Sequence, residues 1–182
     1  MTLKTQSMTT IVEKNIPGYP GFYARTDGLI RGPRGILTSY PANQDGHQQV
    51  WVKKANWYRH NSVLVHRLLA FTFVHNPRPD IFKTVDHINN NPYDNRVTNL
   101  RWVNTQLNAL NSYAASGFYW DATAKMWGAR LTLNRQTRHL GFFKTSYWAR
   151  KAYKLAKLQA FNRIYRQLTN EAPPTGSDIF WL

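Results

Sequence analysis

Asp86 and His87 are adjacent in the sequence, and Asn108 follows 22 residues after Asp86. Carboxylate and amide oxygens are hard ligands that suit Mg²⁺ or Mn²⁺. A neutral imidazole beside such an ion can accept a proton from water near neutral pH. Among many basic residues, this set of side chains predicts hydrolysis of phosphodiester bonds. Spacing alone leaves an alternative, in which Asp86 is only a turn former in an Asn-rich loop stabilised by Asx turns.

The segment from residue 83 to residue 112 has to position these side chains. We expect a strand at 84–87, a long polar loop at 88–98 and a return strand at 100–103. Asn104 or Thr105 can then cap a helix. Such a strand-loop-strand hairpin, with the helix folded back across it, can bring a residue of the first strand close to a residue of the helix.

The residues before this segment predict small elements. Between residues 16 and 56, short apolar runs alternate with turn signals such as Asp27-Gly28 and Asp45-Gly46, which predicts a small, twisted antiparallel meander. Residues 61–74 are denser in apolar side chains and predict a helix, capped by Asn61 or Ser62 and stopped by Asn76-Pro77. An internal strand is the competing prediction for 61–74, because Val and Phe are frequent there.

The residues after this segment predict a sheet and a helix. Three strands are expected at 118–120, 126–133 and 137–143. Thr145 or Ser146 can cap a helix that continues to about residue 165, with alanines at helical spacing that allow close packing on a sheet.

The overall composition restricts the partner and the compartment. The 182 residues hold 24 Lys and Arg against 9 Asp and Glu, a net charge of +15, which indicates a polyanionic partner. The absence of cysteine excludes disulfide frameworks, thiolate zinc sites and cysteine nucleophiles. No apolar run approaches the ~20 residues that a membrane span requires. We therefore expect a folded, soluble, intracellular protein that binds nucleic acid.

The segment V-D-H-I-N-N-N-P-Y-D-N-R-V-T-N-L-R-W-V-N-T-Q-L-N (85–108) resembles the HNH, or ββα-metal, motif of phage and intron homing endonucleases. The resemblance implies that His87 is the general base, and that Asp86 and Asn108 are the protein ligands of one divalent metal ion, Mg²⁺ or alternatively Mn²⁺. Asn108 stands in place of the second His of the motif. Asn99 resembles the residue that ties the long loop and orients the base.

Two segments upstream resemble parts of the same group of nucleases. V-H-R-L-L-A-F-T-F-V (65–74) resembles the helix before the motif, and I-P-G-Y-P-G-F-Y-A-R-T-D-G-L-I-R (16–31) is similar to the NUMOD segment. His66 is either a supporting catalytic residue, or a histidine on the helix surface or a phosphate contact. Arg67 and Arg101 are either phosphate contacts or solvated charges.

The C-terminal part, residues 116–156, resembles the DNA-binding domain of the Apetala/ethylene-response type, a three-stranded sheet with one helix. Asp121 is the only acidic residue between 113 and 169. The resemblance implies that strand Arg and Trp side chains contact DNA, and the candidates are Trp120, Trp127, Arg130, Arg135 and Arg138. Trp127 and Arg130 are expected to point to opposite sides of the sheet, because alternate residues of a strand share a face. Each Trp is as plausible in the core.

These features predict an α+β protein with a small antiparallel N-terminal sheet, a ββα-metal nuclease core and a C-terminal three-stranded antiparallel sheet packed on one helix. The expected boundaries are a mobile leader at 1–13, a NUMOD-type segment at 14–60, the HNH core at 61–112, the Apetala/ethylene-response-type domain at 113–167 and a tail at 168–182. We expect the HNH core to fold without the residues that follow it.

The expected function is that of a site-preferring, metal-dependent endonuclease of duplex DNA that leaves a 5′-phosphate and a 3′-hydroxyl. We expect a monomer, encoded by a phage or mobile element, that nicks one strand in the cytoplasm of a bacterial host, with no membrane association and no small-molecule cofactor. One rival is a non-catalytic DNA-binding regulator that keeps the hairpin as a scaffold. Another is a basic RNA-binding protein whose aromatic side chains stack on single-stranded bases.

Overall fold

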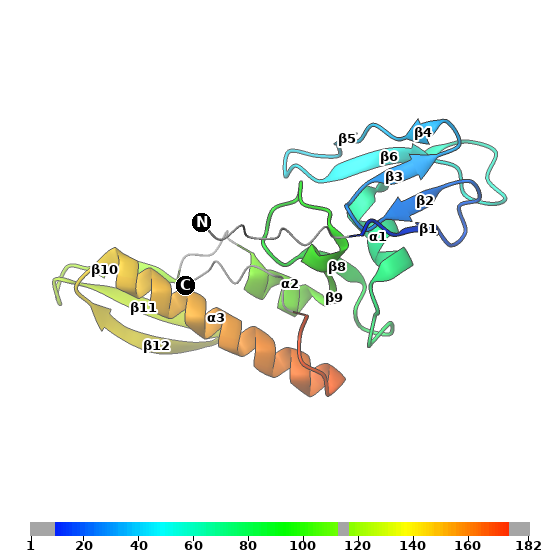
Figure 1. Cartoon of the computed structure of the whole chain (residues 1–182). Coiled ribbons are helices and arrows are strands. Elements are labelled where there is room, and N and C mark those ends of the chain that lie inside the picture. Colours follow the sequence, from blue (N-terminus) through cyan, green and yellow to red (C-terminus); the bar gives the residue numbers. More distant parts are fainter. Residues whose placement is uncertain (1–9, 113–116, 175–182) are drawn as a thin grey trace, which may run out of the picture. The chain divides into compact units, whose positions relative to one another are not determined.

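The computed structural model describes residues 10–112 and 117–174 and combines small antiparallel sheets with helices (Figure 1). The expected α+β class is confirmed. The chain divides into two compact units. Unit 1 comprises residues 1–75 and 91–100, and unit 2 comprises residues 76–90 and 101–182. The expected domain boundaries remain a prediction, and the compact units do not follow them. The expected leader lies mostly outside the described residues, as does the end of the expected tail.

The N-terminal meander of unit 1 forms two small sheets instead of one. The first contains, in order, β1 (Glu13–Asn15), β2 (Tyr23–Arg25), β3 (Ile30–Gly32) and β4 (Gly35–Ile36). The second contains β5 (Tyr40–Pro41), β6 (Gln48–Val52) and β7 (Asn61–Leu64). The Asp27-Gly28 turn joins β2 to β3, as its hairpin signal predicts. Gly28 has a φ of +96°, and a Cβ there would lie 2.9 Å from the backbone carbon of Asn95, so glycine is required.

The apolar segment 61–74 contains both of the elements that competed for it. Asn61–Leu64 is strand β7, and the helix α1 (Val65–Phe73) begins directly after it. Asn61 and Ser62 therefore lie in the strand and do not cap the helix, whose N-cap is Leu64 without a side-chain hydrogen bond. One face of α1 is buried through Val65, His66, Leu68, Leu69 and Ala70, and the helix contacts β2 and β6.

The predicted strand-loop-strand-helix is present. The strand β8 (Thr84–His87) pairs with β9 (Leu100–Val103), which follows a short 3₁₀ helix, η1 (Val97–Asn99). The helix α2 (Thr105–Asn111) begins after Asn104, whose side chain accepts a hydrogen bond of 2.9 Å from the backbone N–H of Leu107. This is the capping interaction that the sequence predicted.

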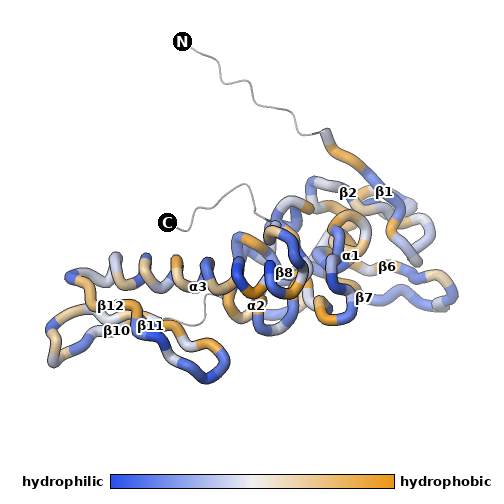
Figure 2. Tube along the Cα trace, turned by 90° about the horizontal axis from the view of Figure 1, so that it is seen from below, coloured by the Kyte–Doolittle hydropathy of each residue, from blue (hydrophilic) through white to orange (hydrophobic). Residues whose placement is uncertain are grey.

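The C-terminal sheet and helix also follow the prediction. β10 (Phe118–Asp121), β11 (Met126–Leu133) and β12 (Gln136–Phe143) form one antiparallel sheet in that order. Thr145 caps α3 (Ser146–Thr169) through the N–H of Trp148, and Asn170 ends the helix in the left-handed conformation. Hydrophilic and hydrophobic residues alternate along α3 (Figure 2).

None of the helices in the described residues combines the length and apolar character needed to cross a membrane.

The helix α3 is shared between the sheet and the hairpin of unit 2. It contacts all three strands of the sheet, where Ala149 and Tyr153 are buried. Its second half contacts α2, and the rings of Tyr165 and Phe82 lie 5.6 Å apart between centroids. Lys157 Nζ donates to the carbonyl oxygen of Ser112 at 2.6 Å. An HNH core that ends near Ser112 would therefore lose the helix against which it packs.

Candidate active site

The carboxylate of Asp86 is the centre of a buried polar cluster in unit 2. Asp86 lies in β8 and Arg101 in β9, and both are almost fully buried. Arg101 donates to Oδ2 of Asp86 from Nη2 at 2.8 Å and from Nε at 2.9 Å. From α2, the side-chain amide of Asn111 donates to both carboxylate oxygens at 3.0 Å. The two strands and the helix therefore meet at one carboxylate.

Burial dominates the electrostatics of this ion pair. Removal from water raises the pKa of the Asp86 carboxyl, and the positive charge of Arg101 and the hydrogen bond from Asn111 oppose that rise. Burial lowers the pKa of the Arg101 guanidinium, and the charge of Asp86 opposes that change. Each group therefore depends on the other to remain charged inside the protein.

His87 follows Asp86 in β8 and is also buried. Its backbone carbonyl oxygen accepts hydrogen bonds of 2.8 Å from the Asn111 side chain and from the backbone N–H of Asn90. Asn111 thus holds the side chain of Asp86 and the backbone carbonyl of His87 together.

Asn108 lies one turn before Asn111 in the same helix. Its side chain is exposed, and it precedes Asn111 by three residues, a spacing that places both on one face of α2. The structure therefore brings Asn111 into contact with Asp86 and leaves Asn108 facing solvent one turn earlier. The carboxylate of Asp86 and the side-chain oxygen of Asn108 are hard donors of the kind that fit a divalent ion such as Mg²⁺ or Mn²⁺.

Asn99 ties together the loop that leads into β9. Its side-chain amide donates to the carbonyl oxygen of Asp94 at 2.7 Å, and its backbone N–H donates to the carbonyl oxygen of Arg96 at 2.8 Å. In unit 1 this loop is fastened to the turn after β2, because the N–H of Val97 donates to the carbonyl oxygen of Thr26 at 3.3 Å. Asn99 therefore occupies the loop-tying position that the resemblance implies.

His66 lies in the first turn of α1 and is only 5% exposed, so it is not a histidine of the helix surface. Its ring centroid lies 5.0 Å from that of His47, which directly precedes β6. Sequence reasoning missed His47, because no spacing links it to His66. Arg67, the next residue of α1, is exposed and free to meet a phosphate or water.

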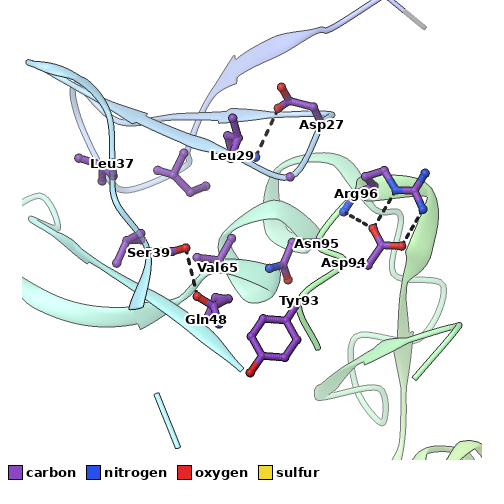
Figure 3. A pocket seen from close by; sticks show the side chains of 13 residues that line it. Asp27, Leu29, Leu37, Ser39, Gln48, Val65, Tyr93, Asp94, Asn95 and Arg96 are labelled. Atoms are coloured by element: carbon purple, nitrogen blue, oxygen red, sulfur yellow. Dashed lines mark hydrogen bonds and ion pairs between the residues drawn. The ribbon is translucent and has the colours of Figure 1, made fainter. Parts of the chain in front are cut away.

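Unit 1 also contains a cleft of about 260 Å³ between the turn after β2, strand β6 and residues 93–96 (Figure 3). Its charged groups are already paired. Asp94 contacts Arg96 at 2.7 Å, and Asp27 contacts Arg25 at 2.7 Å. Ser39 donates to the side-chain oxygen of Gln48 at 3.2 Å. The cleft therefore offers a ligand little uncompensated charge.

The C-terminal sheet has a covered side and an open side. Trp127 shares its side with Ala129, which is fully buried, and its cross-strand partner is Trp120. Arg130 lies on the opposite side, as expected from the strand alternation, with its guanidinium 5.1 Å from the ring centroid of Tyr119. Since Ala129 is buried together with Ala149 of α3, the helix covers the side of Trp127.

Aromatic and basic residues share the open side of the sheet. His139 is the cross-strand partner of Arg130, and its ring centroid lies 4.7 Å from that of Phe142. Tyr119, His139 and Phe142 were not among the sequence candidates, and alternation alone would not find both His139 and Phe142, because a register shift between Ala129 and Arg130 brings them to one side. Arg135 is exposed in the turn between β11 and β12, and Arg138 is exposed opposite Leu131.

The predicted phosphate contact of Arg101 stays a prediction. Its guanidinium is buried against Asp86 and lies 3.8 Å from the ring centroid of Phe161 in α3. The hypothesis of a solvated charge does not fit this residue, which is 5% exposed.

Comparison with known proteins identifies relatives of this chain that are described as endonucleases. No protein-family profile matches the chain. Two proteins of Acanthamoeba polyphaga mimivirus, both described as uncharacterized HNH endonucleases, are 31% identical over 62% of this chain and 33% identical over 47% of it. The DNA endonuclease I-HmuI of Bacillus phage SP01 is 30% identical over 54% of this chain.

The chain spans only part of these relatives. It covers 28% and 25% of the mimivirus proteins and 55% of I-HmuI. A solved structure described as DNA binding and cleavage by the HNH homing endonuclease I-HmuI has a TM-score of 0.48, with 27% identity over 55% of this chain and 56% of that one. The sequence similarity to the curated relatives confirms the resemblance to HNH endonucleases that the motif predicted.

Proposed function

We propose that this protein is a metal-dependent endonuclease of the HNH type that hydrolyses phosphodiester bonds of duplex DNA. One observation carries the proposal. The Asn111 side chain of α2 donates hydrogen bonds to both carboxylate oxygens of Asp86 and to the carbonyl oxygen of His87. These bonds hold α2 against the two residues to which the HNH motif assigns metal binding and proton transfer. The similarity to proteins described as HNH endonucleases supports the same reaction class.

In this proposal His87 accepts the proton of the attacking water, since a neutral imidazole is a competent base near neutral pH. Asp86 and Asn108 hold one divalent ion, Mg²⁺ or alternatively Mn²⁺. When bound, such an ion would stabilise the negative charge that develops on the phosphate during hydrolysis. Asn99 keeps the loop before β9 in place, and His66 supports the reaction from α1. The products are a 5′-phosphate and a 3′-hydroxyl.

Duplex DNA binds to the basic surface of the chain. The open side of the C-terminal sheet presents Arg130 among aromatic rings, and a ribbon of strands fits a major groove ~12 Å wide. Arg135 and Arg138 add exposed cations near the β11–β12 turn. Trp120 is 51% exposed and contributes at the edge, whereas Trp127 is half-buried and contributes less. These contacts give site preference, and one catalytic centre in a monomer nicks one strand.

A supercoiled-plasmid assay tests the proposal. With Mg²⁺ we expect conversion to the nicked circle, and DNA ligase should reseal it, because ligase requires a 5′-phosphate beside a 3′-hydroxyl. Nicking that continues in excess EDTA would exclude the metal. Tight DNA binding without nicking, in any divalent ion, would favour the rival, a DNA-binding regulator that keeps the hairpin as a scaffold.

A further inference from the structure

Arg101 is held on two sides inside unit 2. Its Nη2 and Nε atoms donate to the same oxygen of Asp86, Oδ2, at 2.8 and 2.9 Å. The guanidinium carbon lies 3.8 Å from the ring centroid of Phe161, a residue of α3 that is itself buried. A contact to DNA phosphate would require the guanidinium to leave both partners, at the cost of an unpaired buried carboxylate.

The hydrogen bonds of Asp86 distinguish its two oxygens. Oδ2 accepts both bonds from Arg101 and one from Asn111, whereas Oδ1 accepts from Asn111 alone among the bonds described. A carboxylate has about two acceptor positions on each oxygen. Oδ2 is therefore saturated, and Oδ1 keeps a lone pair for a further ligand. Carboxylates that bind metal ions are commonly oriented by outer partners in this manner.

We infer that Arg101 is a positioning residue for the metal-ligand carboxylate: it occupies Oδ2 of Asp86, turns Oδ1 toward the ion, and is itself supported by Phe161 of α3. The inference rests on the proposed function, since it requires Asp86 to be a ligand. It assigns Arg101 to metal binding and not to DNA binding. It also makes the helix that carries the C-terminal sheet a structural support of the metal site.

Mn²⁺ binding without DNA tests this assignment in the full chain, by electron paramagnetic resonance of the free ion. Arg101→Gln should weaken Mn²⁺ affinity by about 10–100-fold, the usual effect of losing an outer partner. Arg101→Lys should restore part of the loss, because it keeps the charge without the planar fork. Phe161→Leu should weaken affinity less than Arg101→Gln. The matched control is Arg163→Gln, which removes an exposed positive charge from α3 and should bind Mn²⁺ like the wild type.

DNA affinity is measured on the same variants in EDTA. A positioning role leaves the affinity of Arg101→Gln, and its salt dependence, equal to those of Arg163→Gln. Unchanged Mn²⁺ affinity together with weaker DNA binding, and a salt slope smaller by about one unit, would show a phosphate contact and overturn the inference.

Two further results are decisive. If circular dichroism shows that Arg101→Gln is unfolded, unchanged Mn²⁺ affinity in both Arg101→Lys and Phe161→Leu overturns the inference. A wild-type chain that neither binds Mn²⁺ nor nicks plasmid overturns the proposed function and the inference together. A wild type that nicks, with variants whose Mn²⁺ affinity is unaltered, overturns the inference alone.

Discussion

The side-chain amide of Asn111 lies 3.0 Å from each carboxylate oxygen of Asp86 and 2.8 Å from the carbonyl oxygen of His87. A residue at the end of α2 thus fastens the helix to the strand that carries both catalytic candidates. Asn108, one turn earlier on the same helix, is exposed. We therefore predict separate roles for the two asparagines: Asn111 stabilises the fold, and Asn108 binds the proposed metal ion.

Asn111→Ala should lower the stability of the fold, whereas Asn108→Ala should weaken metal binding. Asn111→Ala removes a donor from a buried carboxylate, so we expect a loss of about 1–3 kcal/mol in the free energy of unfolding. Asn108→Ala should keep wild-type stability but need more Mg²⁺ for half-maximal nicking, with at least partial rescue at high Mg²⁺, because a neutral ligand is lost while Asp86 remains. Urea unfolding and a Mg²⁺ titration of nicking measure the two effects. Wild-type Mg²⁺ dependence in Asn108→Ala would show that Asn108 is not a ligand.

His87→Ala tests the general base. The nicking rate should fall by a factor of about 10²–10⁴, the usual contribution of a general base, while DNA affinity changes little. Single-turnover nicking and a gel-shift titration measure the two quantities. Nicking by the alanine variant at the wild-type rate would assign the base to another residue.

Truncation after Ser112 should unfold the hairpin and α2. The fragment would lack Phe161, which lies under Arg101, and Tyr165, which packs against Phe82. Removing large buried aromatic side chains costs about 3–5 kcal/mol each, which is comparable to the stability of a small domain. Far-UV circular dichroism and a thermal melt of residues 1–112 measure the effect. A cooperative melt near that of the full chain would show that the core folds by itself.

Arg130→Gln tests the open side of the C-terminal sheet. If Arg130 neutralises one phosphate, the slope of log affinity against log salt should decrease by close to one unit. Arg163→Gln removes the same charge from an exposed position of α3 and serves as the control. Equal slopes in both variants would place DNA elsewhere on the chain.

The ion pair between Asp27 and Arg25 should make unit 1 sensitive to acid. The hydrogen bond from Arg25 lowers the pKa of the Asp27 carboxyl below its ordinary value. The pair therefore adds stability above that ordinary value, and the contribution is lost as the pH falls through the lowered pKa. Asp27→Asn should cost up to about 1 kcal/mol at pH 7 and nothing at pH 2. Denaturant unfolding at both pH values checks this, and an equal loss at pH 2 would point to the hydrogen bond between Asp27 and the N–H of Leu29.

Local sequence signals predicted the elements of unit 2 well. The polar run between two apolar strands, the caps Asn104 and Thr145, and the strand alternation around Arg130 each depend on neighbours a few residues away. Such signals can be recognised in the sequence without knowledge of the tertiary contacts. The structure of the segment 61–74 was harder to predict, because β-branched residues favour a strand there while the spacing of apolar residues favours a helix. The segment forms a strand followed by a helix.

Contacts between distant residues could not be predicted in this way. Arg101 meets Phe161 across 60 positions of sequence, and no local pattern distinguishes a buried arginine from a phosphate contact. Asn111 had a weak signal, its spacing of three from Asn108, but the residue that reaches Asp86 depends on how α2 lies on the strand. His47 lies beside His66 only because β6 packs against α1.

The continuity of α3 limits how the C-terminal sheet of this protein can be exchanged for another DNA-binding domain. Its first half packs against the C-terminal sheet, and its second half supports Arg101 and Phe82. A chimaera that replaces everything after Ser112 with a foreign DNA-binding domain would therefore lose both halves of α3. A productive fusion point lies inside the helix, between Tyr153 and Lys157, where an incoming helix in the same register would replace the sheet-binding half and keep the residues beneath the hairpin.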